Sequence, residues 1–367
     1  MKRSIYLQPT GIFWDRTARR GIDEPELNVW RGLPLAGGRL SFAALDILTR
    51  DGAETKRRTV VLGDAFSGDW GREGLAASDI LDALSAQRPR LCGLSLDRPR
   101  LMGIVNVTPD SFSDGGHHAT TQSAIAHALK LADDGADILD IGGESTRPGS
   151  DAVSLQDELA RVIPVIKGLR GQTGKLISVD TRKAEVMRRA ADAGADILND
   201  VSALTHDPDA LTAAAETGLP VMLMHTRGDP KTMNEDPQYA DVVLDVFDWL
   251  ELRIKACVAA GIPKAKIVAD PGLGFAKHLK HNVAVMAGLS LYHGLGVPIL
   301  LGASRKKMIG QLCNVDDPAD RVPGSLACAI AGAAQGVQIF RVHDVKETKQ
   351  ALEVWRASMA GSEQGLG

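Results

Sequence analysis

The chain has 367 residues, of which 44% are hydrophobic and 24% charged, so it is long enough to bury one large core, or one large and one small. The net charge of -4 and the aromatic content of 4% argue against nucleic acid or a membrane surface as a partner. The start resembles no signal peptide, no apolar run reaches about 18 residues, and no cysteines have CxxC spacing, so we expect a cytoplasmic protein with reduced thiols.

The first 87 residues differ in pattern from the rest of the chain. Strands are expected at 40–48 and 59–62 and a short helix at 78–86, with glycine and arginine frequent between them. This pattern predicts a small α+β extension at residues 1–87, either a module of its own or a segment packed on the remainder. It contains no grouping of residues typical of a catalytic site.

From about residue 100 onward, a β-rich run, a polar loop and a segment of helical period recur eight times. The strands are expected at 101–107, 137–141, 176–179, 196–198, 220–224, 266–269, 298–301 and 337–340. The helices are expected at 120–134, 154–170, 183–193, 207–217, 238–260, 279–290, 305–312 with 318–335, and 344–360. Eight β-then-α units within roughly 260 residues are typical of a (β/α)8 TIM barrel, which we place at residues 88–367.

Every predicted strand ends in, or is followed by, charged, amide or other polar side chains. In chain order these are Asn106, Asp140, Asp180, Asn199 with Asp200, His225, Asp270, Ser304 with Arg305, Lys306 and Lys307, and Arg341 with His343. Any one Asp or Asn could be a turn former or a helix cap. Because the carboxyl ends of barrel strands meet at one rim, where active sites lie, the whole set instead predicts a binding site.

The chemistry of this set indicates a class of ligand. Cations follow the seventh and eighth strands, where barrels often bind phosphate. Carboxylates and amides end the middle strands, and they can pair with the hydrogen-bond donors of an aminopyrimidine edge. The sequence therefore predicts a flat, amide-like heterocycle that carries a phosphate.

Two long motifs carry a more specific resemblance. Residues 102–116 read Met-Gly-Ile-Val-Asn-Val-Thr-Pro-Asp-Ser-Phe-Ser-Asp-Gly-Gly, and residues 140–149 read Asp-Ile-Gly-Gly-Glu-Ser-Thr-Arg-Pro-Gly. Six short motifs follow: Ser178-Val179-Asp180-Thr181, Asn199-Asp200-Val201, Leu223-Met224-His225, Asp270-Pro271-Gly272-Leu273-Gly274-Phe275, Ser304-Arg305-Lys306 and Arg341-Val342-His343-Asp344-Val345. In this order, over roughly residues 90–360, they resemble the signatures of the dihydropteroate synthases.

The resemblance implies a transferase of folate biosynthesis. In this family, 6-hydroxymethyl-7,8-dihydropterin diphosphate loses diphosphate to give a cation-like pterin. The amine of p-aminobenzoate then attacks the pterin methylene carbon and gives 7,8-dihydropteroate. The two small-molecule substrates are the expected partners. A homodimer is expected by analogy with family members, which are also targets of sulfonamides.

The resemblance also implies residue roles. The pterin ring would be held by Asp180, Asn199, Met224, Asp270 and Lys306, of which Asp180, Asp270 and Lys306 would be catalytic. The diphosphate would be held by Asn106, Arg341 and His343, with Mg²⁺ on Asn106, because a hydrated Mg²⁺ needs few protein ligands beside phosphate oxygens. The p-aminobenzoate pocket would contain Thr146, Arg147, Pro148 and Phe275, with the loops 108–118 and 142–152 closing over it.

Some residues differ from those usual in the family, and two acidic residues in the long motifs are expected to have a structural role. Lys307 stands where many relatives have a small hydroxyl residue, so it either strengthens binding of the p-aminobenzoate carboxylate or points to solvent. Asp110 and Glu144 are expected to organise their loops rather than to catalyse. Relatives commonly begin near Arg90, so we expect residues 88–367 to fold and act without the extension.

Two other functions are compatible with parts of the pattern. A barrel that transfers a methyl group from a methylated folate to a cobalamin protein could share the middle-strand Asp and Asn residues. It would not need the Thr-Pro-Asp-Ser-Phe loop or the anion site at Arg341 and His343. A homologue that binds a pterin or stabilises a partner without catalysis should lose the diphosphate residues or Lys306, and all of these are present.

Overall fold

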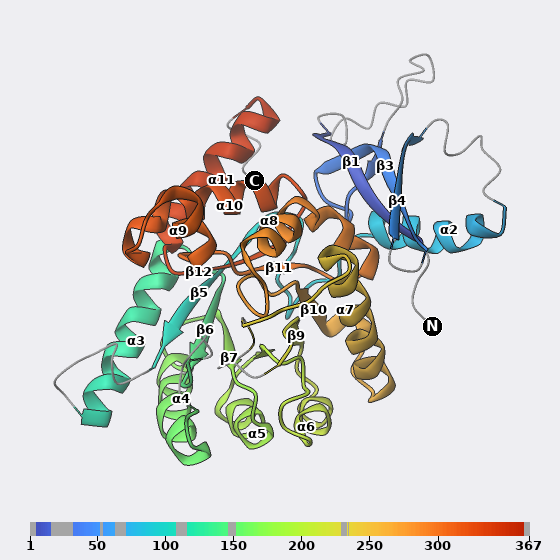
Figure 1. The fold of residues 1–367 in the computed structure, drawn as a ribbon. Helices are drawn as coiled ribbons and strands as arrows, with labels where there is room; N and C mark the ends of the chain where they lie inside the picture. The colour runs from blue at the N-terminus through green and yellow to red at the C-terminus, as the bar shows by residue number, and fades with distance from the viewer. Residues whose placement is uncertain are drawn as a thin grey trace.

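The structure is a computed structural model, and it describes residues 5–15, 32–51, 54–62, 71–107, 116–145, 152–228, 233 and 235–362. Among these residues, eight strands run parallel in the order β10-β9-β8-β7-β6-β5-β12-β11 (Figure 1). They are β5 (Arg100–Asn106), β6 (Ile138–Gly142), β7 (Leu176–Asp180), β8 (Ile197–Asp200), β9 (Val221–Met224), β10 (Ile267–Asp270), β11 (Leu300–Leu301) and β12 (Ile339–Val342). A parallel bridge between Ala269 and Ile299 joins the two ends of the sheet, which confirms the predicted TIM barrel.

Helices cover the outside of the barrel, as the alternating pattern predicts (Figure 1). They are α3 (Gly116–Asp134), α4 (Leu155–Arg170), α5 (Ala184–Ala193), α6 (Ala210–Thr217), α7 (Val242–Ala259), α8 (Leu279–Ala287), α9 (Lys307–Cys313), α10 (Val322–Ala333) and α11 (Val345–Ala360). Strands such as β9 and β10 are buried along their whole length. Because both faces of a barrel strand are covered, the sequences of these strands are short apolar runs in which apolar and polar residues do not alternate.

The interior of the barrel is closed at the end where the strands begin. Seven strands each contribute one buried apolar side chain to a single cluster there: Met102, Ile138, Ile197, Met222, Val268, Leu300 and Ile339. Leu91 and Leu96, which precede the first barrel strand, belong to the same cluster. The strand-end polar residues therefore occupy the opposite, carboxyl end, where barrel active sites lie.

Two predicted helices are broken in the structure. The segment expected at 279–290 is α8 followed by a 3₁₀ helix, η3 (Leu289–Leu295), with Gly288 between them. The segment expected at 318–335 is a 3₁₀ helix, η4 (Pro318–Arg321), followed by α10. Proline lies in the first turn of both η4 and α10, because a proline tolerates the start of a helix but disrupts its interior.

The extension forms an antiparallel sheet with one helix. It contains β1 (Ile5–Trp14), β2 (Leu33–Pro34), β3 (Leu40–Asp51), β4 (Glu54–Val61) and α2 (Gly71–Ser85). β3 pairs with β1 and also with β2 and β4, so β1 lies at an edge of the sheet. The α+β prediction is confirmed, although the sequence did not predict β1 or β2.

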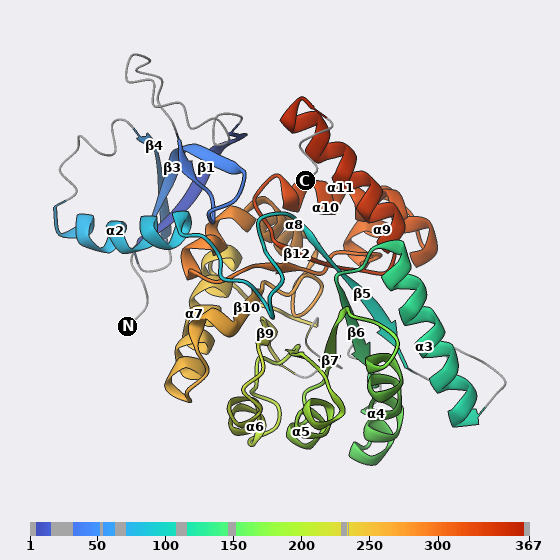
Figure 2. The same cartoon turned by 180° about the vertical axis from the view of Figure 1, so that it is seen from behind.

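The extension packs against the barrel beside α7 and η3 (Figures 1 and 2). Tyr6 and Leu48 are buried in the same apolar cluster as the barrel helices, and the Tyr6 ring meets Phe247 of α7 edge-on at 5.6 Å. The Tyr6 hydroxyl donates a hydrogen bond to Asp248 (2.7 Å), which also pairs with Arg50 (3.1 Å). The extension is therefore packed on the barrel through both apolar and charged contacts.

No helix within the described part of the chain is long and apolar enough to cross a membrane.

Candidate active site

Four side chains in the carboxyl-terminal halves of their strands form one hydrogen-bonded group at that end of the barrel. Arg341 of β12 donates from Nε to Asp140 of β6 (2.6 Å) and from Nη2 to Asp180 of β7 (2.8 Å). Asn199 of β8 donates from Nδ2 to the same Asp140 carboxylate (3.2 Å). The structure therefore brings together Asp180, Asn199 and Arg341, as the convergence of parallel strand ends predicts.

Asp180 presents an acceptor that its own surroundings leave unused. Its Oδ2 accepts from Arg341, but its Oδ1 is buried and has no hydrogen-bond partner among the residues that the structure describes. Burial raises the pKa of Asp180 to about 7, with Arg341 opposing the shift and Asp140 adding to it. A buried, unpaired carboxylate oxygen is costly, so its place in a barrel mouth indicates a ligand that supplies an N–H donor.

Lys306 and Asp270 lie beside this group. A Cβ atom added to Gly302 would lie 3.8 Å from Lys306 Nζ, 3.9 Å from Asp270 Oδ2 and 3.9 Å from the Cβ of Arg341, so the three side chains surround one point. Lys306 donates a hydrogen bond to the carbonyl of Leu273. Burial lowers the pKa of Lys306 to about 8, with Asp270 opposing the shift and Arg341 adding to it.

The loop after β10 shapes the next wall of the site. Asp270 Oδ1 accepts from the backbone N–H of Gly272 (2.7 Å), and the ring of Phe275 lies 4.9 Å from Lys306 Nζ. Gly272 has φ +67°, and a Cβ there would lie 2.0 Å from the carbonyl oxygen of His225 and 3.1 Å from the side chain of Met224. Only glycine fits there. Met224 pairs in register with Asp270 across β9 and β10, so both residues lie at the same end of the barrel.

The predicted diphosphate residues end neighbouring strands. Asn106 ends β5 and is partly exposed, and β5 pairs with β12, after which His343 follows. His343 Nδ1 lies 3.0 Å from the hydroxyl of Ser304, which also accepts from the backbone N–H of His343 (3.2 Å). The structure thus fixes His343 against Ser304 at the same rim as Arg341.

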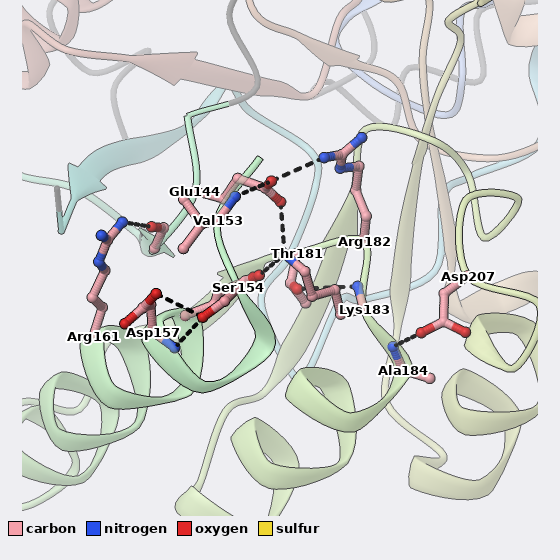
Figure 3. Close-up of polar contacts among 12 residues, drawn as sticks. Glu144, Val153, Ser154, Asp157, Arg161, Thr181, Arg182, Lys183, Ala184 and Asp207 are labelled. Atoms are coloured by element: carbon pink, nitrogen blue, oxygen red, sulfur yellow. Dashed lines mark hydrogen bonds and ion pairs between the residues drawn. The ribbon is translucent and has the colours of Figure 1, made fainter. Parts of the chain in front are cut away.

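Glu144 organises the base of the second predicted loop (Figure 3). Its carboxylate is buried, and it accepts from the N–H of Val153 (3.1 Å), from Arg182 (3.0 Å) and from Lys183 (3.0 Å). Burial raises the pKa of Glu144, but the Val153 N–H and the two cations lower it by more. This partnership supports the loop-organising role expected from the sequence. Thr146, Arg147, Pro148 and Asp110 lie outside the described residues.

Three polar residues near the strand ends turn away from the open rim. Asp200 accepts from the N–H and hydroxyl of Ser202 (2.6 Å each) and from the N–H of Leu204 (3.0 Å), so it stabilises its own loop. His225 is fully buried beneath the loop after β10. Lys307 is exposed and begins α9, which favours the solvent-facing alternative for this residue.

Two buried residues contribute to the site more than the sequence suggested. Asp140 was predicted to end a strand, but only the structure shows that it is the acceptor shared by Arg341 and Asn199. Lys277 had no predicted role. It lies two residues after the Asp270–Phe275 motif, and no periodicity or charge pattern marks it.

The sequence of this chain is similar to that of one known family of proteins. The chain matches the family described as "Pterin binding enzyme" over residues 102–343. It is 52% identical over 270 residues to a dihydropteroate synthase of Escherichia coli, covering 74% of this chain and 95% of the relative.

Solved structures agree with this family. A dihydropteroate synthase of Xanthomonas albilineans, solved with 4-aminobenzoic acid, has a TM-score of 0.71 and 52% identity over 75% of this chain and 99% of its own. The Yersinia pestis enzyme, solved with a sulfonamide drug, has a TM-score of 0.69 and 51% identity over 72% of this chain and 96% of its own. With its barrel, its strand-end residues and these relatives, the chain belongs to the dihydropteroate synthases, which are transferases within the pterin-binding enzyme family.

Proposed function

We propose that this protein condenses 6-hydroxymethyl-7,8-dihydropterin diphosphate with p-aminobenzoate to give 7,8-dihydropteroate and diphosphate, a reaction of folate biosynthesis. The observation that carries the proposal is the buried Oδ1 of Asp180, which lacks a donor among the described residues and lies beside Asn199 and Arg341. A pterin ring supplies N–H donors in one plane, and such a ring satisfies this acceptor.

The pterin lies among Asp180, Asn199, Asp270 and Lys306, with Met224 against its face. The carboxylates accept from the N–H groups of the ring, and the Lys306 ammonium donates to a ring acceptor. The family membership of the chain and the convergence of Asp270, Lys306 and Arg341 around Gly302 support this placement. Charges of both signs lie close together here, so one site can bind a ring that has both donors and acceptors.

The chemistry then follows from charge and position. The C–O bond between the pterin methylene and the diphosphate breaks, and its electron pair leaves with the diphosphate. The nearby carboxylates of Asp180 and Asp270 stabilise the positive charge that develops on the pterin. The lone pair of the p-aminobenzoate nitrogen forms the new C–N bond, and that nitrogen then loses a proton.

The diphosphate meets Asn106, Arg341 and His343. The Nη1 group of Arg341 has no hydrogen-bond partner among the described residues, so it is a donor that a phosphate oxygen can use. No group of three or more His, Cys, Asp or Glu residues in the described part of the chain could hold a metal ion. Asn106 would hold a Mg²⁺ through its amide oxygen beside the phosphate oxygens, and the ion would neutralise charge on the leaving group.

The p-aminobenzoate binds against Phe275, and the family resemblance assigns Thr146, Arg147 and Pro148 to the same pocket. The Phe275 ring beside Lys306 supports this placement, since a flat aromatic substrate can pack on that ring. The sulfonamide bound to the Yersinia pestis relative further suggests that sulfonamides compete for this pocket here. A cytoplasmic homodimer completes the proposal, and sedimentation of the purified protein tests the dimer.

Identification of the product tests the reaction. Purified protein is incubated with Mg²⁺ and both substrates, and the mixture is resolved by chromatography against authentic 7,8-dihydropteroate. The proposal expects dihydropteroate to accumulate, and to do so more slowly when a sulfonamide is added. Consumption of the pterin substrate without any dihydropteroate would contradict it.

A further inference from the structure

A buried lysine holds the loop that follows β10. Lys277 is 4% exposed, and its ammonium group donates to the carbonyl of Gly272 (2.9 Å) and to the carbonyl of Phe275 (3.1 Å). Its Nζ also lies 2.9 Å from Nδ1 of His225. Burial lowers the pKa of Lys277 well below its usual value, and Asp270 opposes the shift. The two carbonyls and the His225 ring nitrogen offer acceptors to three N–H groups, so this geometry favours the ammonium form despite the burial.

His225 gives this lysine a rigid acceptor. Its ring is fully buried and meets the ring of Trp249 edge-on at 4.9 Å. Burial and the nearby Lys277 lower the pKa of His225 well below its usual value, so the imidazole is neutral and can accept at Nδ1. Packing against α7 thus fixes the imidazole, and the imidazole fixes the ammonium.

The same loop is held by a second lysine, the one predicted to contact the pterin. The carbonyls of Gly272 and Phe275 accept from Lys277, and the carbonyl of Leu273 accepts from Lys306. Lys306 also lies against the Phe275 ring. A shift of the loop would therefore move both Phe275 and the partner of Lys306.

We infer that Lys277 is a positioning residue: through the carbonyls of Gly272 and Phe275 it sets where the Phe275 ring and the Lys306 ammonium stand in the site. The inference rests on the proposed function, in which Phe275 meets p-aminobenzoate and Lys306 meets the pterin. Lys277 contacts the loop backbone and the His225 ring, and the proposed substrate contacts do not include it.

The test compares two lysine-to-methionine variants in the same segment. Lys277→Met keeps much of the side-chain volume and removes the Nζ contacts with Gly272, Phe275 and His225 described above. Lys280→Met is the matched control, because Lys280 is exposed on α8. We expect Lys277→Met to raise the KM for p-aminobenzoate, and also that for the pterin diphosphate, at least tenfold and to change kcat less than threefold, with Lys280→Met like the parent. Simple loss of folded protein would lower apparent kcat and leave KM unchanged, and that result would overturn the inference.

A second readout does not depend on turnover. We expect hydrogen exchange of the backbone amides at 272–277 to be at least tenfold faster in Lys277→Met than in the parent or in Lys280→Met. If the parent shows no turnover, the proposed function fails and this exchange measurement alone decides the inference. If Lys277→Met does not fold, His225→Phe decides it, since it removes one acceptor but keeps a ring against Trp249. Unchanged exchange at 272–277 in the folded variant contradicts the inference.

Discussion

At the scale of single residues, Asp180 is the side chain on which pterin binding depends most. Its Oδ1 is a buried acceptor without a donor among the described residues, and hydrogen bonds that involve a charged group contribute about 1.5–3 kcal/mol. We expect Asp180→Ala to weaken binding of a pterin ligand by at least about tenfold, measured by calorimetry. Asp192→Ala, at an exposed position of α5, is the matched control. An unchanged affinity in Asp180→Ala would remove Asp180 from the site.

The two shifted pKa values at the site predict how pterin affinity varies with pH. Asp180, with its pKa near 7, binds donors best when ionised, so affinity should rise as the pH rises toward 7. Lys306, with its pKa near 8, donates best when protonated, so affinity should fall as the pH rises above 8. On the acid side below pH 7 and on the alkaline side above pH 8, the pterin affinity should change about tenfold per pH unit.

Calorimetric titrations between about pH 5.5 and about pH 9.5, roughly 1.5 pH units beyond each pKa, check this profile. Asp180→Asn should remove the dependence of pterin affinity on pH below 7 and should leave its dependence above pH 8 unchanged. A pH-independent affinity in the parent protein would show that neither group changes its charge on binding.

At the scale of structural elements, the loop after β10 depends on one glycine. A Cβ at Gly272 would meet the carbonyl oxygen of His225 at 2.0 Å, whereas a Cβ at Gly274, which also has positive φ, would meet only the flexible side chain of Lys306 at 3.4 Å. Gly272→Ala should therefore lower the free energy of unfolding by more than about 3 kcal/mol, and Gly274→Ala by about 1–2 kcal/mol. Urea unfolding measures both, and equal losses would contradict the close approach.

The elements of the barrel were predicted well because its pattern is local. Each strand is a short apolar run between turn residues, and the side chains that end it must lie at one rim whatever the details of packing. β1 was not predicted, since Pro9 and Gly11 interrupt its alternation. At a sheet edge, a proline need not break the ladder, and only the pairing with β3 makes this segment a strand.

The site residues that end strands were predicted from the sequence, whereas a residue that acts through tertiary contacts was not. Asp180, Asn199 and Arg341 were found because they directly end strands, and their hydrogen bonds confirm that they meet. Lys277 was not found, because its contacts are with the backbone of a folded loop and with a histidine 52 residues away in sequence. A role that arises from tertiary contacts of this kind leaves no periodic signal.

At the scale of the whole molecule, residues 1–87 and 88–367 remain our proposed division, but the two parts share a buried interface. Arg50 is nearly buried and pairs with Asp245 (3.0 Å) and Asp248 (3.1 Å) of α7. Removing one partner of a buried pair costs about 3–5 kcal/mol. We expect Arg50→Met to lower the melting temperature by several degrees, measured by thermal unfolding.

Arg57 provides the control for this interface. It pairs with Asp46 within the extension and is 59% exposed, so Arg57→Met should cost under about 1 kcal/mol. A barrel cut at residue 88 exposes the surface around Phe247 and should fold with lower stability than the full chain. Equal melting temperatures for the parent and Arg50→Met would show that the extension does not stabilise the barrel through this contact.

The central claim is that the rim of this barrel joins a pterin diphosphate to p-aminobenzoate. The most direct measurement is release of diphosphate by the full-length protein with Mg²⁺, 6-hydroxymethyl-7,8-dihydropterin diphosphate and p-aminobenzoate, with each component omitted in turn. We expect release that requires both substrates and Mg²⁺, and that equals the dihydropteroate formed. No release from a protein that still binds the pterin would contradict the claim, because binding without transfer would make the chain a non-catalytic member of its family.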